Sequence, residues 1–383
     1  MRVTVFGTYD ATAHPRVAII AQGLREHGHE VQECNAPLGL DTAARVKILA
    51  QPWRVPVLLG TLGRRWLTLI GTARRQPRPD LVLVGYLGHF DVRLARRLFR
   101  RTPIVLDHLI GASDTARDRQ LSGGIRQVLL RAIDSGALRS ADLVAVDTEE
   151  HLEALPAEYQ DRAVVVPVGA PRAWFDAAPA PAADAVDTTA SESSSGPLRV
   201  LFFGLYTPLQ GAPVIGQALA RLAGAPVEAT MVGKGQDGPQ TREAAAANPA
   251  VRWLDWVPSD ELPALVAAHD VCLGIFGTGP KALRVVPNKV FQGAAAGCAI
   301  VTSDTPPQRR TLGDAAVLVP PGDPAALAAA LLGLAADRSE LARMRRLARQ
   351  LAARRFTPEQ VVAPLVERLH LAGGTGRVAQ PAR

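Results

Sequence analysis

Cysteine is scarce in this chain: its 383 residues include three, Cys34, Cys272 and Cys298. They form no CxxC pair and no histidine cluster stands beside them, which argues against a disulfide scaffold or a structural zinc site. Lone thiols in a chain of this size fit a reducing compartment, so we expect a cytoplasmic protein. No apolar run reaches the roughly eighteen residues of a membrane-spanning helix, and the first residues show a strand pattern instead of a signal peptide.

Aromatic residues make up 5% of the chain, and no helix-turn-helix, RNP-like or zinc-finger pattern accompanies the basic residues. The sequence therefore gives little support for nucleic-acid binding. Other signatures are absent as well. Without GxGxxG, GxxxxGK[ST], GxSxG or HExxH, the ordinary dinucleotide-binding, P-loop, nucleophile-elbow and zinc-protease classes are poor interpretations.

Positive charge gathers in one part of the chain. The formal net charge is +7, and thirteen basic residues stand between positions 45 and 101 against two acidic ones. A patch of this kind attracts phosphate groups on lipids, nucleic acids or substrates. Because Trp66, Leu67 and Leu69 are interleaved with the arginines of segment 64–101, peripheral contact with an anionic membrane, at its inner face, is one interpretation. A solvated basic surface is the other, and both remain open.

The two halves of the sequence repeat one pattern. Each opens with an apolar strand, a loop and a helix: RVTVFG at 2–7 with a helix at 17–28, and LRVLFFG at 198–204 with a helix at 214–223. These strands are too uniformly hydrophobic to face water on either side, and similar strands alternate with helical segments along both halves. This order predicts an α/β fold with two doubly wound, Rossmann-like domains.

The predicted domain boundaries follow the composition. Residues 1–176 form the N-terminal domain and residues 198–355 the C-terminal one, with a linker or disordered loop rich in Pro, Ala and Ser at 177–197. A helix at 356–371 and a flexible tail at 372–383 complete the chain. Ligands of open α/β sheets bind beyond the carboxyl ends of the strands, so two such domains facing each other would hold their ligand in a central cleft.

Basic residues crowd the start of one predicted helix, in the segment KALRVVPNKVFQGAAAGCAIVTSD at 281–304. A helix N-terminus offers unpaired N–H groups and a positive dipole, which together bind phosphate. Cations oppose that dipole unless an anion is present, and here Lys281, Arg284 and Lys289 all stand near it. We therefore predict a diphosphate site. A capped helix whose cations are merely solvated is the alternative.

Polar residues also follow strands of the N-terminal domain. Asp107 and His108 end the strand PIVLDH, and Asp114 follows in GASDT. Aspartates at strand ends serve as often as caps or loop staples as in catalysis, so a direct role and a structural role both remain open. The loop TYDATAHPR after the first strand supplies three further candidates on the acceptor side, Asp10, His14 and Arg16.

Several segments together resemble the donor domain of family 4 GT-B glycosyltransferases. They are LRVLFFGLYTPLQGAPVIGQAL, VGKGQ, the stretch from LDWVPSDEL through the helix NKVFQGAAAG, and AAVLVPPGDPAALAAAL. The N-terminal half resembles the acceptor domain of that family, and FTPEQVVAPLVERLH resembles the C-terminal helix that returns to it. The likeness runs from about residue 1 to 370 and is strongest from Leu198 to Asp323.

The chain departs from most members at the donor site. Most members carry two glutamates around the helix NKVFQGAAAG, and these positions align with Arg284 and Gln292. Most members also have an Arg and a Lys that clamp the diphosphate, and these align with Leu205 and Gln210. The sequence is similar to a subgroup with TPLHG-like and KxxRVxPNK-like segments. The cations of segment 281–289 are predicted to supply the missing charge.

The resemblance implies transfer of a hexose from a nucleoside diphosphate sugar to a hydroxyl acceptor, with retention of configuration and without a metal or cofactor. The acceptor would be a glycoside, a lipid-linked saccharide or a natural product. A sugar-nucleotide 2-epimerase and a catalytically impaired nucleotide-binding protein remain alternatives. The catalytic candidates are Asp107, His108, Asp114 and Arg284. The implied donor-binding residues are Gly204, Tyr206, Gln210, Gly233, Gly235, Trp256, Val257, Lys281, Arg284, Val286, Asn288, Lys289 and Gln292.

Overall fold

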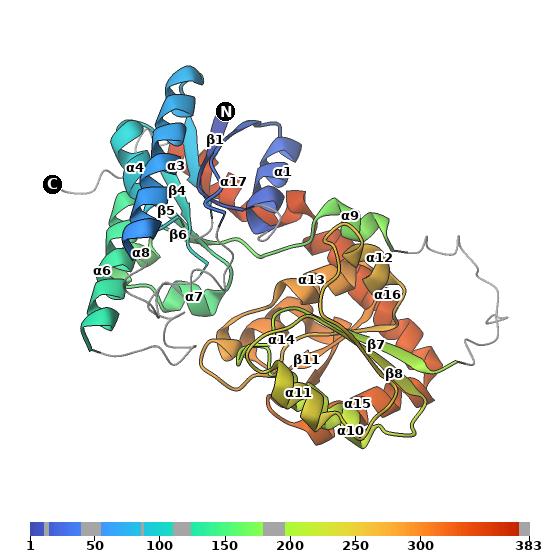
Figure 1. Cartoon of the computed structure of the whole chain (residues 1–383). Helices are drawn as coiled ribbons and strands as arrows, with labels where there is room; N and C mark the ends of the chain where they lie inside the picture. The colour runs from blue at the N-terminus through green and yellow to red at the C-terminus, as the bar shows by residue number, and fades with distance from the viewer. Residues whose placement is uncertain (11–14, 40–54, 86–87, 110–123, 179–195, 375–383) are drawn as a thin grey trace. The chain divides into compact units, whose positions relative to one another are not determined.

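Two compact units make up the chain, Met1–Pro167 with Pro358–Arg383, and Val168–Thr357. Each unit is built around one six-stranded parallel sheet with helices packed against it, and Figure 1 shows the two units with their elements labelled. This arrangement confirms the predicted α/β fold with two doubly wound domains. The computed structural model describes residues 1–10, 15–39, 55–85, 88–109, 124–178 and 196–374.

The first unit alternates strands with helices. Its elements are β1 (Arg2–Gly7), α1 (Arg16–Glu26), β2 (Glu30–Asn35), α3 (Val55–Arg75), β3 (Leu81–Val84), α4 (Asp91–Leu98), β4 (Ile104–Asp107), α6 (Gly124–Ser140), β5 (Leu143–Val146), α7 (Glu149–Glu153), α8 (Ala157–Gln160), β6 (Ala163–Val165) and α17 (Pro358–Gly374). The strand order is β2-β1-β3-β4-β5-β6, so the direction of winding reverses between β1 and β3.

Strand β3 shows why the strands are uniformly apolar. Leu81 and Leu83 belong to one hydrophobic cluster with residues of α1 and α17, whereas Val82 and Val84 belong to another with residues of α3, α4 and α6. Because helices cover both faces of the sheet, each position along the strand must be apolar.

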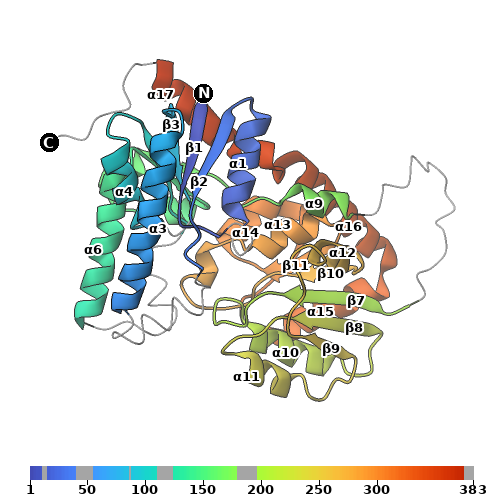
Figure 2. The ribbon, with the colours of Figure 1, turned by 45° about the horizontal axis from the view of Figure 1, so that its top comes forward.

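The C-terminal helix α17 belongs to the first unit and packs along α1 (Figure 2). The two helices approach closely at Gly23, where a Cβ atom would collide with the carbonyl group of Pro358. Glycine is therefore required at this position for α17 to seat. The predicted helix began at residue 356; the observed one begins at Pro358.

The second unit also winds strands and helices alternately. Its elements are α9 (Arg172–Asp176), β7 (Leu198–Phe203), α10 (Ala212–Arg221), β8 (Val227–Val232), α11 (Gly238–Ala244), β9 (Val251–Leu254), α12 (Leu262–Ala267), β10 (Val271–Leu273), η2 (Ala282–Arg284), α13 (Asn288–Ala295), β11 (Ala299–Ser303), α14 (Pro306–Leu312), η3 (Gly313–Ala315), β12 (Ala316–Val319), α15 (Pro324–Ala336) and α16 (Arg338–Arg355). The order β12-β11-β10-β7-β8-β9 puts the topological switch between β7 and β10, where sheets of this kind bind ligands beyond the carboxyl ends.

The first unit ends earlier than the predicted N-terminal domain, which ran to residue 176. From Val168 onward the chain packs with the second unit. The N–H of Ala170 donates to the carbonyl oxygen of Phe356 at 2.9 Å, and the ring of Trp174 stacks on Phe203 with ring centres 5.6 Å apart. Most of the predicted linker and most of the predicted tail lie outside the described residues.

Candidate functional site

Three predicted donor-site glycines lie just beyond the carboxyl ends of β7 and β8. Gly204 and Gly233 have φ angles of +138° and +122°, which side-chain-bearing residues rarely adopt. A Cβ atom on Gly233 would overlap the carbonyl oxygen of Gly204, and one on Gly235 would overlap the backbone of Tyr206. The glycines therefore let two loops meet backbone to backbone at the switch point.

Lys289, the second residue of α13, reaches this same place from the other side of the switch. Its side chain is buried, at 4% exposure. The Nζ atom lies 3.7 Å from the centre of the Phe202 ring and donates to Oε1 of Gln210. The ammonium also lies 3.1 Å from the point where a Cβ on Gly204 would stand. We call Phe202, Gly204, Gln210 and Lys289 the Lys289 site.

The charge of Lys289 has no counter-charge among the described residues. Burial lowers the pKa of the ammonium to about 7, because a charged group loses its hydration there. The nearby thiol of Cys272 offers no compensation, since burial raises its pKa to about 12 and keeps it protonated. A buried cation without a partner is costly, so the site is suited to receive an anion.

Helix α13 adds to the positive field at this place. Its N-cap is Pro287, which offers no side-chain hydrogen bond to the first turn. The unpaired N–H groups and the dipole of that turn therefore favour an anion. Asn288 lies exposed at the first position, and Gln292, one turn further on, is buried. The structure thus brings Gln210, Lys289 and Gln292 together around the start of one helix.

The loop between β10 and α13 holds the other predicted cations. Ala282 and Val285 form a small apolar cluster with Ile275, against which Leu209 packs. This cluster fixes the single turn η2, which carries Arg284 exposed at its end. The remaining predicted loop residues, Lys281 and Val286, are half-buried and buried respectively. Arg284 and Lys289 therefore differ sharply in solvation, a distinction that the sequence did not reveal.

Two predicted base-side residues and one tyrosine have contrasting environments. Trp256 follows β9 and is 75% exposed, with Val257 half-buried beside it. Tyr206 is 1% exposed, and its ring lies 5.7 Å from that of Phe202. Burial raises the pKa of Tyr206. Its backbone N–H donates to the carbonyl of Lys234 at 3.1 Å, so Tyr206 shapes the site as a core residue that anchors the glycine loop.

A second polar cluster lies at the carboxyl end of β4 in the first unit. Nε of Arg16 donates to Oδ1 of Asp107 at 2.8 Å, and both side chains are almost fully buried. Nη1 of Arg16 donates to the carbonyl oxygen of Pro167 at 3.0 Å. Within the described residues, the other oxygen of Asp107 and Nη2 of Arg16 are buried without hydrogen bonds. Burial raises the pKa of Asp107 despite the guanidinium beside it.

His108 lies beside this ion pair and contacts residues that the sequence did not single out. Its ring meets His89 edge to face at 5.4 Å, and Nε2 of His89 lies 3.3 Å from Oδ1 of Asp134. Burial lowers the pKa of His108 to about 4, so its imidazole is neutral near pH 7. His108 directly follows β4, and His89 stands in the turn between β3 and α4. A polar residue in the connection after a buried strand is the signal that could have identified His89.

Three predicted residues of the first unit remain, Asp10, His14 and Asp114. Asp10 is half-buried in the loop after β1. His14 and Asp114 lie outside the described residues. Across the described ranges, no three His, Cys, Asp or Glu side chains gather closely enough to hold a metal ion.

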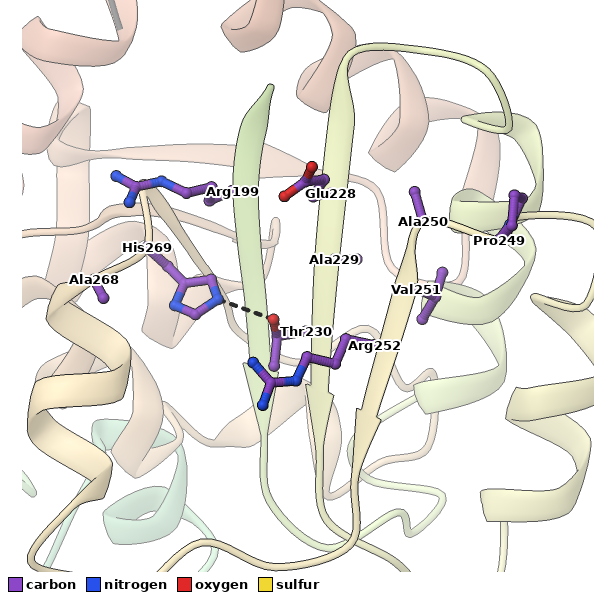
Figure 3. Close-up of a pocket in the computed structure, with 10 residues that line it drawn as sticks. All are labelled: Arg199, Glu228, Ala229, Thr230, Pro249, Ala250, Val251, Arg252, Ala268 and His269. Atoms are coloured by element: carbon purple, nitrogen blue, oxygen red, sulfur yellow. Dashed lines mark hydrogen bonds between the residues drawn. The ribbon is translucent and has the colours of Figure 1, made fainter. Parts of the chain in front are cut away.

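A separate hollow lies on one face of the second sheet, near the amino ends of its strands. Figure 3 shows Arg199, Glu228, Thr230 and Arg252 projecting from β7, β8 and β9 toward it. His269 lines its side, with Nε2 3.0 Å from Oγ1 of Thr230. None of the predicted site residues lines this hollow, which is distant along the strands from the carboxyl ends.

Residues 197–337 match a family model described as Glycosyl transferases group 1. That range contains the whole Lys289 site. No curated protein sequence matches the chain. Among solved structures, sucrose-phosphate synthase from Thermosynechococcus elongatus is similar over 98% of this chain and 99% of its own, with a TM-score of 0.70 and 15% identity.

Two further structures show the same likeness. Anabaena Alr3699/HepE, solved in complex with UDP, has a TM-score of 0.65 and 17% identity over 97% of this chain and 99% of its own. An α,α-trehalose-phosphate synthase (UDP-forming) from Burkholderia vietnamiensis has a TM-score of 0.64 and 14% identity over the same shares. Residues 197–337 therefore match a glycosyltransferase group 1 domain, and the whole chain has the fold of these GT-B neighbours.

Proposed function

We propose that the protein is a retaining glycosyltransferase that moves a hexose from a nucleoside diphosphate sugar to a hydroxyl acceptor, without a metal or cofactor. The Lys289 site holds the donor diphosphate in this proposal. The observation that carries it is the ammonium of Lys289, which is 4% exposed, rests on the Phe202 ring and has no acidic partner among the described residues. A diphosphate at Gly204 would supply the missing negative charge.

The contact between Lys289 and Gln210 supports this role. Gln210 stands where the resembled family carries a lysine of its diphosphate clamp. Here the amide oxygen of Gln210 accepts a hydrogen bond from the ammonium of Lys289. The positive charge thus reaches the loop after β7 from helix α13. We infer that the positive charge of the clamp is retained, although Lys289 of α13 supplies it here instead of a lysine in the loop after β7.

The chemistry that follows is electrostatic. Negative charge builds on the diphosphate as the bond to the sugar breaks, and the Lys289 ammonium, the α13 dipole and Arg284 stabilise it. The acceptor hydroxyl gives its proton to the departing diphosphate oxygen, as the resemblance implies. On the acceptor side, neutral His108 is suited to hydrogen-bond a hydroxyl. Asp107 already pairs with Arg16, so we assign it a positioning role.

Two findings support the nature of the donor and the compartment. Anabaena Alr3699/HepE was solved with UDP and with UDP-glucose, and its fold likeness to this chain favours a nucleotide-sugar donor here. Cys34, Cys272 and Cys298 are buried and unpaired, which supports a cytoplasmic location.

A thermal-shift series with UDP, GDP, dTDP, ADP and CDP tests the donor site. We expect one nucleotide to raise the melting temperature clearly, because a ligand at a hundred times its Kd adds about 2.7 kcal/mol of stability. No shift with any nucleotide, in a folded sample, would remove the proposed site. A shift without sugar transfer or donor hydrolysis would favour the catalytically impaired alternative.

Arg284→Ala should weaken this shift and raise the donor KM about tenfold, the usual scale for an exposed charge on a phosphate. The matched control is Arg354→Ala, which removes an equally exposed arginine from α16 of the same unit. If Arg284→Ala kept the wild-type KM, Arg284 would not contact the donor diphosphate, and Lys289 would be the side chain that neutralises its charge.

Nucleotide affinity should depend on pH through Lys289. In the ligand-free protein its pKa is about 7, whereas a bound diphosphate favours the ammonium and raises that pKa. Below pH 7 the group is already charged, so affinity is flat; above pH 7 binding requires protonation, and Kd should rise up to about tenfold per pH unit. Calorimetric titrations between pH 7 and 9 test this, above the range where phosphate itself titrates. A constant Kd over that range would contradict it.

A further inference from the structure

Two helices on the same face of the first sheet expose five large apolar side chains. Val57, Leu59 and Leu67 of α3 are 71%, 54% and 70% exposed, and Val128 and Leu129 of α6 are 67% and 60% exposed. The inner sides of both helices enter one hydrophobic cluster. Figures 1 and 2 both show the helices running alongside each other. We call these five residues, with Arg64, Arg65, Arg74 and Arg131, the α3–α6 surface.

Four of these apolar residues gather at one edge of the unit. Helices that connect parallel strands run antiparallel to them, so each helix begins at the carboxyl edge of the sheet. Val57 and Leu59 stand in the early turns of α3, and Val128 and Leu129 in those of α6. The carboxyl edge is also where β4 ends, at Asp107. The exposed apolar residues therefore share an edge with the polar cluster that we assign to the acceptor side.

The charges on this surface all have one sign. Helix α3 contains four arginines and no acidic residue over its 21 positions. Helix α6 has a single acidic residue, Asp134, which is buried near His89. Leu67 lies three positions from Arg64 and seven from Arg74, so these side chains share the outer face of α3. Exposed apolar side chains are thus interleaved with exposed cations.

This surface differs from the basic segment 64–101 that the sequence indicated. Arg93 turns inward and donates to the carbonyl oxygen of Ile133 at 3.4 Å, and Arg96 pairs with Asp142. Neither contributes to an outward patch. The exposed cations of the α3–α6 surface lie on α3 itself, together with Arg131 of α6. Four other exposed arginines of the segment lie outside these two helices, namely Arg78, Arg97, Arg100 and Arg101.

We propose that the α3–α6 surface docks the protein on an anionic lipid bilayer. Apolar side chains set among arginines match the boundary between acyl chains and acidic headgroups. A second copy of the chain fits less well, because pairing two such surfaces would bring like charges together. Nothing among the described helices is both long and apolar enough to cross a membrane. The proposed contact is peripheral, with the α3–α6 surface lying against the headgroups. This inference stands independently of the nucleotide site.

Co-sedimentation of the full chain with vesicles tests the proposal. We expect binding to vesicles of phosphatidylglycerol and phosphatidylcholine at low salt, and little binding to phosphatidylcholine alone. Each arginine near an anionic surface contributes about fivefold in affinity, so R64A/R65A/R74A should lose roughly a hundredfold. Leu67→Asp should lose at least about tenfold, because it removes an inserted side chain and adds a repelled charge.

Matched variants on the second unit separate local docking from net charge. R346A/R354A/R355A removes three exposed arginines of α16, and Leu332→Asp alters a leucine of α15 that is 41% exposed. Both should bind vesicles within about twofold of wild type. Equal losses in both sets, equal binding to phosphatidylcholine alone, or no binding by the wild type would overturn the proposal. Self-association that Leu67→Asp abolishes, without vesicle binding, would assign the surface to a second copy. A cooperative melting transition close to that of the wild type confirms that each variant is folded.

Discussion

Lys289→Met is expected to abolish the nucleotide-induced thermal shift while making the ligand-free protein more stable. Methionine has nearly the length of the lysine stem and can rest on the Phe202 ring, where the ammonium now lies at 3.7 Å from the ring centre. Replacing buried ionic groups with well-packed apolar residues is often neutral or stabilising by about 1–4 kcal/mol, and Lys289 has no acidic partner among the described residues to offset the cost of its burial. Losing a buried charge contact to a ligand costs about 2–5 kcal/mol, so nucleotide affinity should fall by roughly thirtyfold to several thousandfold.

This one variant is expected to gain stability without ligand and to lose nucleotide binding, and these two opposite effects distinguish a ligand-binding lysine from a structural one. A lysine that merely supports the fold would give lower stability on substitution and leave the nucleotide shift unchanged. Lys289→Arg sharpens the test, because it keeps the positive charge but brings a wider, planar group into the space between Phe202 and Gln210. We expect it to retain part of the nucleotide shift and to lose the pH dependence, since a guanidinium does not titrate in this range. Melting curves with and without nucleotide measure both quantities.

Local pattern predicted the fold well because burial on both faces leaves a mark in each strand. β3 is four consecutive apolar residues, and β7 and β8 each carry one exposed charged residue, Arg199 or Glu228, among buried ones. Such runs, alternating with helical segments, have few solutions other than a doubly wound sheet. The loops of the proposed donor site were also predicted from the sequence, whereas the switch point beside them follows from the strand order of the structure.

The solvation of individual side chains was not accessible in the same way. Three cations near the start of α13 look alike in sequence, yet Lys289 is buried and Arg284 is exposed. The difference depends on Phe202 and Gln210, which lie about eighty residues away along the chain and meet Lys289 only in the folded sheet. Counting basic residues along the sequence has the same limit. The count for segment 64–101 includes Arg93 and Arg96, whose side chains are held by contacts with α6 and with Asp142 and do not join an outward patch.

The polar cluster of the first unit illustrates a further limit. A strand-end aspartate such as Asp107 reads equally as a catalytic or a structural group, because the sequence does not show its partner. The structure supplies Arg16, which stands at the first position of α1. It also supplies His89, which the sequence analysis did not single out and which meets His108 only in the folded unit. The ion-pair partner of a side chain, which only the folded structure shows, therefore favours one of the two roles that the sequence left open for Asp107.

Asp107→Ala is expected to destabilise the protein by about 3–5 kcal/mol, since it leaves the guanidinium of Arg16 buried without its partner. The side chains of this pair are 3% and 1% exposed, so water cannot take the place of the carboxylate. Replacing both members with apolar residues, as in R16M/D107L, removes the uncompensated charge and should recover most of that loss. Denaturant unfolding of the wild type and of both variants measures the difference.

Activity in R16M/D107L then separates the two roles that Asp107 can have. If Asp107 acts only by positioning β4 and His108, the double variant should show the wild-type nucleotide shift and transfer sugar within about tenfold of wild type. The matching comparison is His108→Phe, which preserves ring packing against His89 but removes the imidazole nitrogens, and should lower transfer without weakening nucleotide binding. A double variant that is as stable as wild type, binds nucleotide and transfers nothing would instead show that the Asp107 carboxylate touches the acceptor.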